Sequence, residues 1–493
     1  VASLSRALTH CMPLVALIPD ARSFPSPPSL TAPNTSAHEH ELPHVEVGRS
    51  LLRYGPRSTD FKQARKTFHD LLTHRANLVI VHAGRIIVSK SFSAVWTEKP
   101  AYVFSMIRWI INKRGLGNTS FIWSNSASGC DRDICCNLPA LVIAKRFGYD
   151  DCGIMVPNPY FRTPTFWERA IAKQAVASLV ANRTWRSRVN KVFWRGDTLK
   201  RSSKWYNASN LCTTPIERSF DYGNVARMEA ATLTFADPKL FDVRCVTCRP
   251  PVTLVNCKNR TRKDANLSAV LTNFSSVRGK YVPFELFAKY RYFLSLPGTV
   301  SGSYSRHLNG LWQLGGVVLL WSALHVEWYY PALLDGTTHL TINRTSAKPV
   351  VADLARAPAG SPMLMRLLDS ARRIHDRWLC PSCILDFWER VLARVSWHFA
   401  LHKIMDEADE MRKVLVAFRC HKMQLMEVAE FDDDDAPTRF RLRRLSTSPK
   451  DPFSACAWGK PGTAFWNTDL DPDLVVKEAK KAAVRNTSLQ KNA

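Results

Sequence analysis

Short runs of aliphatic and β-branched residues alternate with amphipathic stretches from residue 61 onward. Leu78 to Val81 and Ile86 to Val88 are two such runs, and each has the length of a buried strand. Strands that alternate with helical patterns are typical of α/β domains. Residues 1–55, in contrast, carry seven prolines and no sustained hydrophobic period. We therefore expect a proline-rich linker or stalk over residues 1–55, followed by α/β domains.

A strand-loop-helix-strand unit is readable in the middle of the chain. An apolar strand over residues 289–296 is followed by Pro297 and Gly298, which suit a tight loop. Apolar residues at i, i+3 and i+4 then predict a helix that includes residues 308–312. Two glycines end that helix, and residues 317–320 resume as a buried strand.

The loop of this unit is rich in small residues, so its backbone N–H groups would come close to a diphosphate at the positive end of the helix. Arg306, in the first helical turn, would add a charge-assisted contact. The spacing is neither the GxGxxG nor the Walker pattern, and an ordinary βαβ unit whose glycines only make the turn explains it equally well.

A second basic cluster follows an apolar strand over residues 192–198. Arg195 lies near its end, and an arginine that projects from a strand end over a cleft is suited to bidentate phosphate binding. Arg195, Gly196 and Asp197 also form the cell-adhesion tripeptide. That function needs an exposed loop tip, and the apolar strand that runs directly into the tripeptide argues against one.

The composition is that of a folded protein with an excess of positive charge. Of 493 residues, 46% are hydrophobic and 22% are charged, which excludes wholesale disorder. Lys and Arg outnumber Asp and Glu by 68 to 42, and the formal net charge is +26. This charge favours anionic partners such as phosphate, nucleic acid or a membrane surface.

Two features favour the secretory pathway, in the lumen of the endoplasmic reticulum or Golgi. Nine Asn-X-Ser/Thr sequons occur along the chain. The thirteen cysteines include the pairs Cys245–Cys248, followed by Cys257, and Cys380–Cys383, and this spacing suits local disulfides. Zinc sites are the alternative, but the two pairs are far apart and lack histidines at ligand spacing.

The most apolar long stretch, residues 310–330, does not have the pattern of a membrane span. It contains Gln313, His325 and Glu327 and is interrupted by two glycines, so a buried helix followed by a strand fits it better. The chain begins at Val1 rather than Met. We expect membrane association only through an N-terminal segment that precedes it.

The motifs described above, with others nearby, resemble those of glycosyltransferase family 90, which includes the Rumi-type protein O-glucosyltransferases and the fungal capsule xylosyltransferases. The likeness extends over about residues 120–400. The matching stretches, in chain order, are 154–161 (IMVPNPYF), 193–196 (FWRG), 289–292 (KYRY), 298–306 with 315–318 (GGVV), 326–331 (VEWYYP) and 386–392 (DFWERVL). Each motif is short, and their order and spacing together carry the resemblance.

The resemblance implies a GT-B architecture, in which two Rossmann-like domains face each other across a cleft. We expect an N-terminal, acceptor-side domain over residues 56–285, a C-terminal, nucleotide-sugar-binding domain over 286–400, and a C-terminal helix with a mostly solvated tail over 401–493. It also implies an inverting transfer of glucose or xylose from a UDP-sugar donor to a hydroxyl of a protein or glycan acceptor. The UDP-sugar is a co-substrate, and neither a metal nor another cofactor is expected.

The same template implies the residues of the donor site. Arg195 and Arg306 would neutralise the diphosphate of the donor. Glu327 would bind the ribose or sugar hydroxyls. The loop that cradles the diphosphate would be formed by Gly298, Ser303 and Ser305.

The general base of the family is an Asp near the end of an N-domain strand, and residues 121–133 occupy that place without the Pro that follows it in the family. They offer Asp131, which we expect to be the base, with Asp133 as the second candidate. One carboxylate suffices, because the acceptor hydroxyl loses its proton as it attacks the anomeric carbon. The two residues also fit the DxD pattern of metal-dependent GT-A enzymes. However, DxD recurs within residues 469–473, and the arginines already supply the positive charge of a metal.

Two other functions are compatible with parts of the sequence. A catalytically inactive family-90-like protein would keep the fold and act as a lumenal binding protein. A basic nucleic-acid-binding protein would explain the charge. The positive residues are scattered, however, and no zinc-finger, RRM or KH signature occurs, so we expect no nucleic-acid partner.

Overall fold

The computed structural model describes most of the chain from residue 42 onward. The described residues are 42–55, 57–73, 77–89, 98–124, 135–146, 151–181, 185–198, 222–249, 268, 273–298, 306–323, 325–417, 425–431, 439–446, 448, 450–454 and 465–466. His40–Ala493 form one compact unit and Val1–Glu39 another, and the second of these lies outside the described residues.

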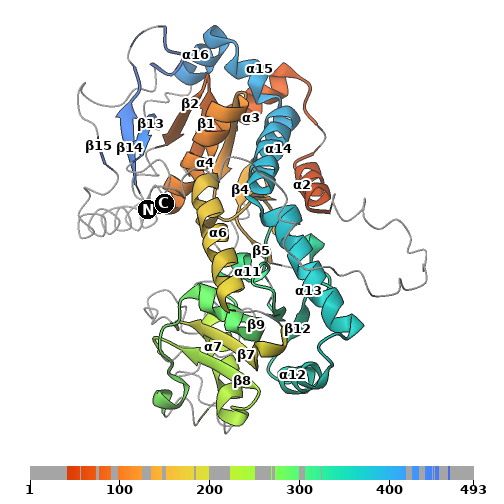
Figure 1. Ribbon diagram of the computed structural model, residues 1–493. Coiled ribbons are helices and arrows are strands. Elements are labelled where there is room, and N and C mark those ends of the chain that lie inside the picture. Colours follow the sequence, from red (N-terminus) through yellow and green to blue (C-terminus); the bar gives the residue numbers. More distant parts are fainter. Residues whose placement is uncertain are drawn as a thin grey trace, which may run out of the picture. The chain divides into compact units, whose positions relative to one another are not determined.

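An eight-stranded mixed sheet is the first of the two large sheets (Figure 1). Its strands, in spatial order, are β15 (Phe465–Trp466), β14 (Phe440–Arg444), β13 (Leu425–Phe431), β2 (Arg85–Ser89), β1 (Leu78–His82), β3 (Thr119–Trp123), β4 (Ala140–Val142) and β6 (Ile154–Met155). The strands β3, β4 and β6 run parallel, whereas the other neighbouring pairs are antiparallel. The two strands predicted near residues 78 and 86 are confirmed as β1 and β2.

Amphipathic helices contribute to the same hydrophobic core as this sheet. They are α2 (Leu42–Leu52), α3 (Phe61–Thr73), α4 (Glu98–Arg114), α14 (Pro381–Phe399), α15 (Leu401–Met405) and α16 (Ala408–Ala417). In α3 the buried residues Ala64, Phe68, Leu71 and Leu72 fall at i, i+4, i+7 and i+8, which places them on one face. Helix α2 lies within residues 1–55, which were expected to form a linker. It buries Val47 and Leu51 in this core, so the described end of that segment is a packed helix.

A five-stranded sheet is the second large sheet, and all its strands are parallel. Its spatial order is β12 (Leu340–Ile342), β10 (Val317–Trp321), β9 (Tyr290–Ser295), β7 (Val189–Gly196) and β8 (Phe241–Cys245). The sheet takes strands from both sides of residue 286, where the sequence suggested a domain boundary. The predicted strands near residues 192, 290 and 317 are confirmed as β7, β9 and β10.

Side chains on both faces of this sheet are buried, as expected for parallel strands covered on both sides. Phe193 and Phe293 belong to the same hydrophobic core as the first sheet. Trp194 and Leu294 belong to a second core on the other face. Helices α7 (Tyr222–Ala236), α12 (Ala347–Arg356) and the first half of α13 (Pro362–Ile374) contribute apolar residues to that second core, whereas Ala371 and Ile374 of α13 belong to the first.

Short elements connect the parts that carry the two sheets. The strand β5 (Lys145–Arg146) pairs with β11 (His325–Val326), and α6 (Pro164–Ala181) packs against α14. The predicted helix after β9 is confirmed as α11 (Arg306–Leu311), and the matched stretch 386–392 lies in α14. The other short elements are η2 (Pro159–Phe161), η3 (Trp185–Ser187), η7 (Phe274–Val277), η8 (Phe284–Lys289), η9 (Tyr330–Ala332) and the π-helical turn η10 (His375–Leu379).

Three disulfides are present within the described part of the chain. Cys245–Cys248 and Cys380–Cys383 confirm the local pairing predicted from their spacing, and Cys136–Cys152 is a third. Cys257 lies outside the described residues.

Across the described residues the fold is mixed α/β, and each of the two large sheets contains parallel strands. None of the described helices combines the length and the apolarity needed to cross a membrane.

Candidate functional site

The strand order of the five-stranded sheet predicts the position at which a ligand binds. Counted along the chain, the strands lie in the order 2-1-3-4-5, so the direction of succession reverses between β7 and β9. In open parallel sheets, ligands bind outside the carboxyl ends of the strands at this reversal. Here β7 ends at Gly196 and continues into Asp197, while β9 ends at Ser295 and continues into Pro297.

A cavity of about 450 Å³ opens at the carboxyl ends of β9 and β10. Ser295 and Pro297 line it from the end of β9, and Trp321 and Ser322 line it from the end of β10. Leu296, Leu320 and Ala323 line it from the same two strand ends, and the remaining described lining comes from β11, from the turn that includes Tyr330, and from residues on and beside β12. Its size is within the range of small-molecule sites.

Arg227, from α7, connects the two loops at the reversal point. Its Nε donates to the carbonyl of Pro297 at 2.9 Å, and its Nη1 donates to the carbonyl of Asp197 at 2.6 Å. The guanidinium also lies 5.5 Å from the centre of the Trp194 ring. Burial lowers the pKa of Arg227 to about 10, so the group still carries its charge at neutral pH. The structure thus fixes a cation between the ends of β7 and β9.

Arg227 does not belong to any of the predicted motifs. Arg227 is the one basic residue of its helix, YGNVARMEAATLTFA. Eleven of the 15 residues of this helix are buried. A cation in a mostly buried helix is a signal, because burying it requires partners. The sequence does not reveal that those partners are carbonyls of two distant loops.

Arg195 is held by an ion pair in this structure. Its Nη2 lies 2.9 Å from each carboxylate oxygen of Asp242, and its Nη1 donates to the carbonyls of Trp194 and Asp242 at 2.9 and 2.7 Å. The guanidinium also packs 4.4 Å from the centre of the Phe193 ring. Arg195 is not among the described residues that line the cavity. Its predicted contact with a diphosphate stays a prediction.

The loop predicted to cradle a diphosphate begins directly after β9, at the carboxyl end of the parallel sheet. Gly298 follows Pro297, whose carbonyl accepts the bond from Arg227. Ser303 and Ser305 lie outside the described residues. Arg306 is the first residue of α11, and nothing is described of its side chain.

The two candidate bases, Asp131 and Asp133, also lie outside the described residues. The strand that precedes them, β3, ends at Trp123 and pairs in parallel with β4. Ser124, the last described residue before both aspartates, follows the carboxyl end of β3. The assignment of Asp131 as the base stays a prediction.

Glu327 is fully buried, with an exposed fraction of 0%. Asn158 donates its Nδ2–H to Glu327 Oε2 at 2.9 Å, and Glu327 Oε1 has no hydrogen-bond partner among the described residues. Burial raises the pKa of this carboxyl to about 8, so it is mostly protonated at neutral pH. The pair joins two of the motifs that carry the family resemblance. The predicted contact of Glu327 with donor hydroxyls stays a prediction.

His325 lines the cavity and is only 6% exposed. Neither ring nitrogen has a hydrogen-bond partner among the described residues. Burial, assisted by Arg146, lowers the pKa of His325 to about 4, so the imidazole is neutral and offers one donor and one acceptor. The sequence marked this residue only as a polar interruption of an apolar stretch.

Comparison with known proteins adds no assignment. No protein-family model matches the chain, and no curated protein matches it. Within the part of the chain that the structure describes, no three His, Cys, Asp or Glu side chains gather as a metal site would require.

Proposed function

We propose that this protein is an inverting glycosyltransferase that transfers glucose or xylose from a UDP-sugar to a hydroxyl of a protein or glycan acceptor. One observation carries the proposal. A cavity lies at the carboxyl ends of a parallel sheet whose order reverses between β7 and β9, and the cation of Arg227 is fixed at that reversal. In doubly wound sheets, nucleotides bind at the carboxyl ends of the strands beside such a reversal. The cavity extends from β9, one of the two strands at the reversal, toward β10 and β12, and Arg227 is not among its described lining residues.

The donor would occupy this cavity, with its diphosphate near the loop that begins at Pro297. Arg227 stands beside that loop and would stabilise the charge that develops on the leaving UDP. His325 offers a neutral donor and acceptor to a nucleoside, because both of its ring nitrogens lack partners among the described residues. Arg195 and Arg306 would add further positive charge, as the family resemblance implies.

The chemical step would need one base. As the acceptor oxygen attacks the anomeric carbon from the face opposite the diphosphate, its proton passes to the carboxylate of Asp131, or of Asp133. The bond between the anomeric carbon and the diphosphate oxygen breaks, and that oxygen keeps the electron pair. The new bond therefore has the opposite anomeric configuration. Positive side chains around the diphosphate would replace a metal in this step.

The architecture we propose is GT-B-like, with the five-stranded parallel sheet as the nucleotide-sugar-binding half. The sheet order, which is that of doubly wound folds, supports this assignment. The other half would be built on the eight-stranded sheet, of which β3, β4 and β6 form a parallel set. The three disulfides support an oxidising compartment, and we propose the lumen of the secretory pathway.

Thermal unfolding with UDP-glucose, UDP-xylose and UDP-galactose tests the donor site. A ligand that binds only the folded chain raises its melting temperature. We expect at least one donor to stabilise the wild type, Arg227→Ala to reduce that gain, and Arg366→Ala, on the exposed surface of α13, to leave it unchanged. A chain that none of the donors stabilises would contradict the proposal.

A second measurement separates an enzyme from an inactive binding protein. Release of UDP from the preferred donor reports transfer to water or to an acceptor. We expect release by the wild type and its loss in Asp131→Asn. Stabilisation by a UDP-sugar without any release of UDP would favour the inactive binding protein.

A further inference from the structure

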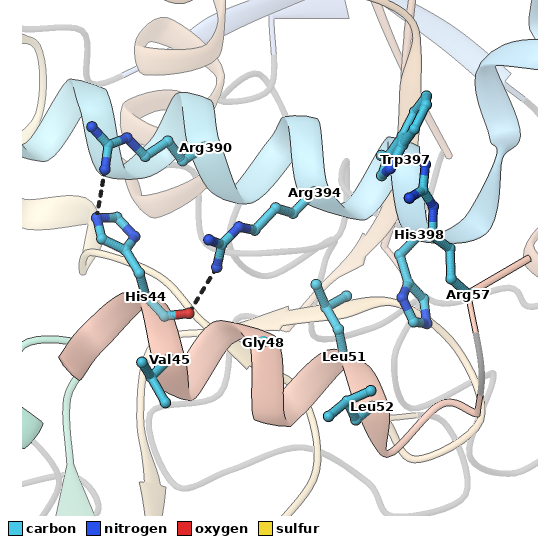
Figure 2. Close-up of a pocket in the computed structure, with 10 residues that line it drawn as sticks. All are labelled: His44, Val45, Gly48, Leu51, Leu52, Arg57, Arg390, Arg394, Trp397 and His398. Atoms are coloured by element: carbon cyan, nitrogen blue, oxygen red, sulfur yellow. Dashed lines mark hydrogen bonds between the residues drawn. The ribbon is translucent and has the colours of Figure 1, made fainter. Parts of the chain in front are cut away.

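A second cavity, of about 510 Å³, lies between α2 and α14 (Figure 2). Figure 2 shows α14 above it, with Arg390 and Arg394 directed toward α2, and α2 below it, with Leu51 and Leu52. This groove, lined by ten described residues, shares none of them with the cavity at the five-stranded sheet. It therefore has no part in the donor site proposed above.

Three arginines line the groove, and no aspartate or glutamate is among its described lining residues. Arg390 donates to the ring Nε2 of His44 at 3.2 Å, and Arg394 donates to the backbone carbonyl of His44 at 2.7 Å. Arg57 lies over the ring of Trp397, 3.7 Å from its centre. These contacts orient the guanidinium groups without neutralising their charge.

The carboxylates of the same two helices are directed to other partners. On α2, Glu46 pairs with Arg49 at 3.1 Å and lies 3.8 Å from Lys145. On α14, Asp386 and Glu389 both pair with Arg114 of α4. The described acidic residues of α2 and α14 therefore do not neutralise the arginines of the groove.

The two histidines of the groove provide hydrogen-bonding groups and little charge. Burial and the two arginines lower the pKa of His44 to about 4, so its ring is neutral and accepts the bond from Arg390. His398 is 9% exposed, and its Nε2 has no hydrogen-bond partner among the described residues. Burial also lowers the pKa of His398. His398 lines this groove and also a smaller neighbouring cavity, so its buried nitrogen without a partner is available to a ligand on the wall of either.

Apolar side chains stand beside these charges. Leu52 is 71% exposed, Trp397 is 57% exposed and Val45 is 45% exposed. Gly48 leaves space in the wall, because a Cβ at this position would meet no atom within 4 Å. Exposed apolar and aromatic residues that surround arginines are the composition of protein-protein contact sites, where Trp and Arg supply much of the binding energy.

We propose that the groove between α2 and α14 binds an acidic segment of a protein partner that carries apolar side chains beside its carboxylates. Arg390 and Arg394 are four residues apart, a rise of about 6 Å along α14. Carboxylates two residues apart in an extended segment are separated by about 7 Å and can reach both arginines. The apolar side chains of the segment would cover Leu52 and Val45. This inference does not depend on the proposed transfer reaction.

A protein segment fits the groove better than a sugar chain or a membrane surface. The ring of Trp397 already packs against Arg57 and is stacked with His402, at 6.0 Å between ring centres, so a sugar would compete with these two side chains for its faces. Arg390 and Arg394 are turned into the groove by their bonds to His44, whereas a flat lipid surface is met by outward-pointing side chains.

Fluorescence anisotropy with a labelled short peptide of glutamate and leucine tests the proposal on the intact chain. We expect the wild type to bind it, and Arg390→Ala with Arg394→Ala to weaken binding at least tenfold. A double variant of equal charge change, Arg366→Ala with Arg373→Ala on the exposed surface of α13, is the control and is expected to stay within twofold. The same peptide with glutamine in place of glutamate is expected not to bind.

A substitution that breaks no contact of the arginines provides the second test. Leu52→Glu adds a carboxylate at the exposed end of α2 and is expected to weaken peptide binding, whereas Leu52→Lys at the same position is not. Equal binding by all variants, or no binding by the wild type, would overturn the proposal. Arginine-dependent binding to vesicles of phosphatidylserine and phosphatidylcholine, without peptide binding, would overturn it in favour of a membrane surface.

Discussion

The guanidinium of Arg195 and the carboxylate of Asp242 form an ion pair on the neighbouring strands β7 and β8, with Nη2 2.9 Å from each carboxylate oxygen. Arg244 also reaches this carboxylate, at 3.1 Å from its Nε. One aspartate therefore compensates two arginines at the edge of the parallel sheet. The consequence is an asymmetry between the partners, because the loss of Asp242 leaves two cations and the loss of Arg195 leaves a carboxylate that still has one.

Substitution of either partner tests this asymmetry. Breaking a buried pair costs about 3–5 kcal/mol, and partial exposure reduces that cost. The side chains of Arg195 and Asp242 are 10% and 21% exposed, so we expect Asp242→Ala to lower the free energy of unfolding by about 2–4 kcal/mol and Arg195→Ala by less. Urea unfolding of both variants and of the double variant measures the coupling. Additive effects in the double variant would show that the pair contributes nothing as a pair.

Glu327 predicts a pH dependence of stability. The carboxyl has an ordinary pKa of 4.5, and burial raises it to about 8 in the folded chain. Both states are protonated below pH 4.5. Between pH 4.5 and 8 the unfolded chain releases the proton while the folded chain retains it, so the stability contributed by the protonated form is lost as the pH rises through this window. Each pKa unit corresponds to about 1.4 kcal/mol.

Glu327→Gln has nearly the same shape and does not titrate. We expect the melting temperature of this variant, relative to that of the wild type, to increase from pH 5 to pH 8 and then to level off. Differential scanning calorimetry at several pH values measures the difference. A constant difference across this range would mean that Glu327 is not a protonated group in the folded chain.

The general base predicts a contrast between two neighbouring aspartates. We expect Asp131→Asn to reduce kcat of transfer by a factor of about 10² to 10⁴, which is the usual contribution of a general base. Asp133→Asn is expected to have a much smaller effect, and neither change should alter stabilisation by the donor. Steady-state assays of both variants decide between them, and a larger loss for Asp133→Asn would reverse the assignment.

Metal dependence is a separate prediction. We expect transfer to continue after removal of divalent cations with EDTA, because positive side chains stabilise the leaving diphosphate. The assay is UDP release by EDTA-treated protein, compared with the same protein after manganese is restored. Activity that appears only with manganese would instead favour a metal held by the Asp131-Arg132-Asp133 pattern.

The disulfides predict unequal contributions to stability. Cys136–Cys152 spans 16 residues and Cys245–Cys248 spans 3. A cross-link that closes a longer loop removes more entropy from the unfolded chain, which gives about 3 kcal/mol for the first pair and about 2 kcal/mol for the second. Paired Cys→Ser substitutions followed by urea unfolding test this order. An equal or opposite ranking would show that strain or residual structure outweighs loop closure.

The unit from β9 to β10 could be predicted from the sequence, because each of its elements is indicated by residues within that element. Aliphatic runs indicate the strands β9 and β10, and Gly315 and Gly316 end the intervening turn before β10 begins at Val317. The spacing of Leu308 and Leu311 indicates α11 in the same way, since both are buried.

Neighbour relations between distant segments could not be predicted in this way. Nothing in the sequence near β7 indicates that it pairs with β9, so the reversal point of the sheet and the position of Arg227 beside it were not predicted. The bonds of Arg227 are made to backbone carbonyls, which carry no side-chain signature. The ion pair of Arg195 was not predicted for a related reason, because Asp242 belongs to the next strand along the chain.

The pairing of β13 with β2 has a consequence for synthesis of the chain. Strand β2 ends at residue 89 and its neighbour β13 begins at residue 425, whereas the five strands of the parallel sheet all lie between residues 189 and 342. During synthesis, all strands of the parallel sheet can therefore leave the ribosome before β13, the strand that pairs with the edge of β2, has been made. An unpaired strand edge is a template for association with other chains. The period in which β2 is most exposed to aggregation, and most in need of a chaperone, thus ends only when residues 425–431 emerge.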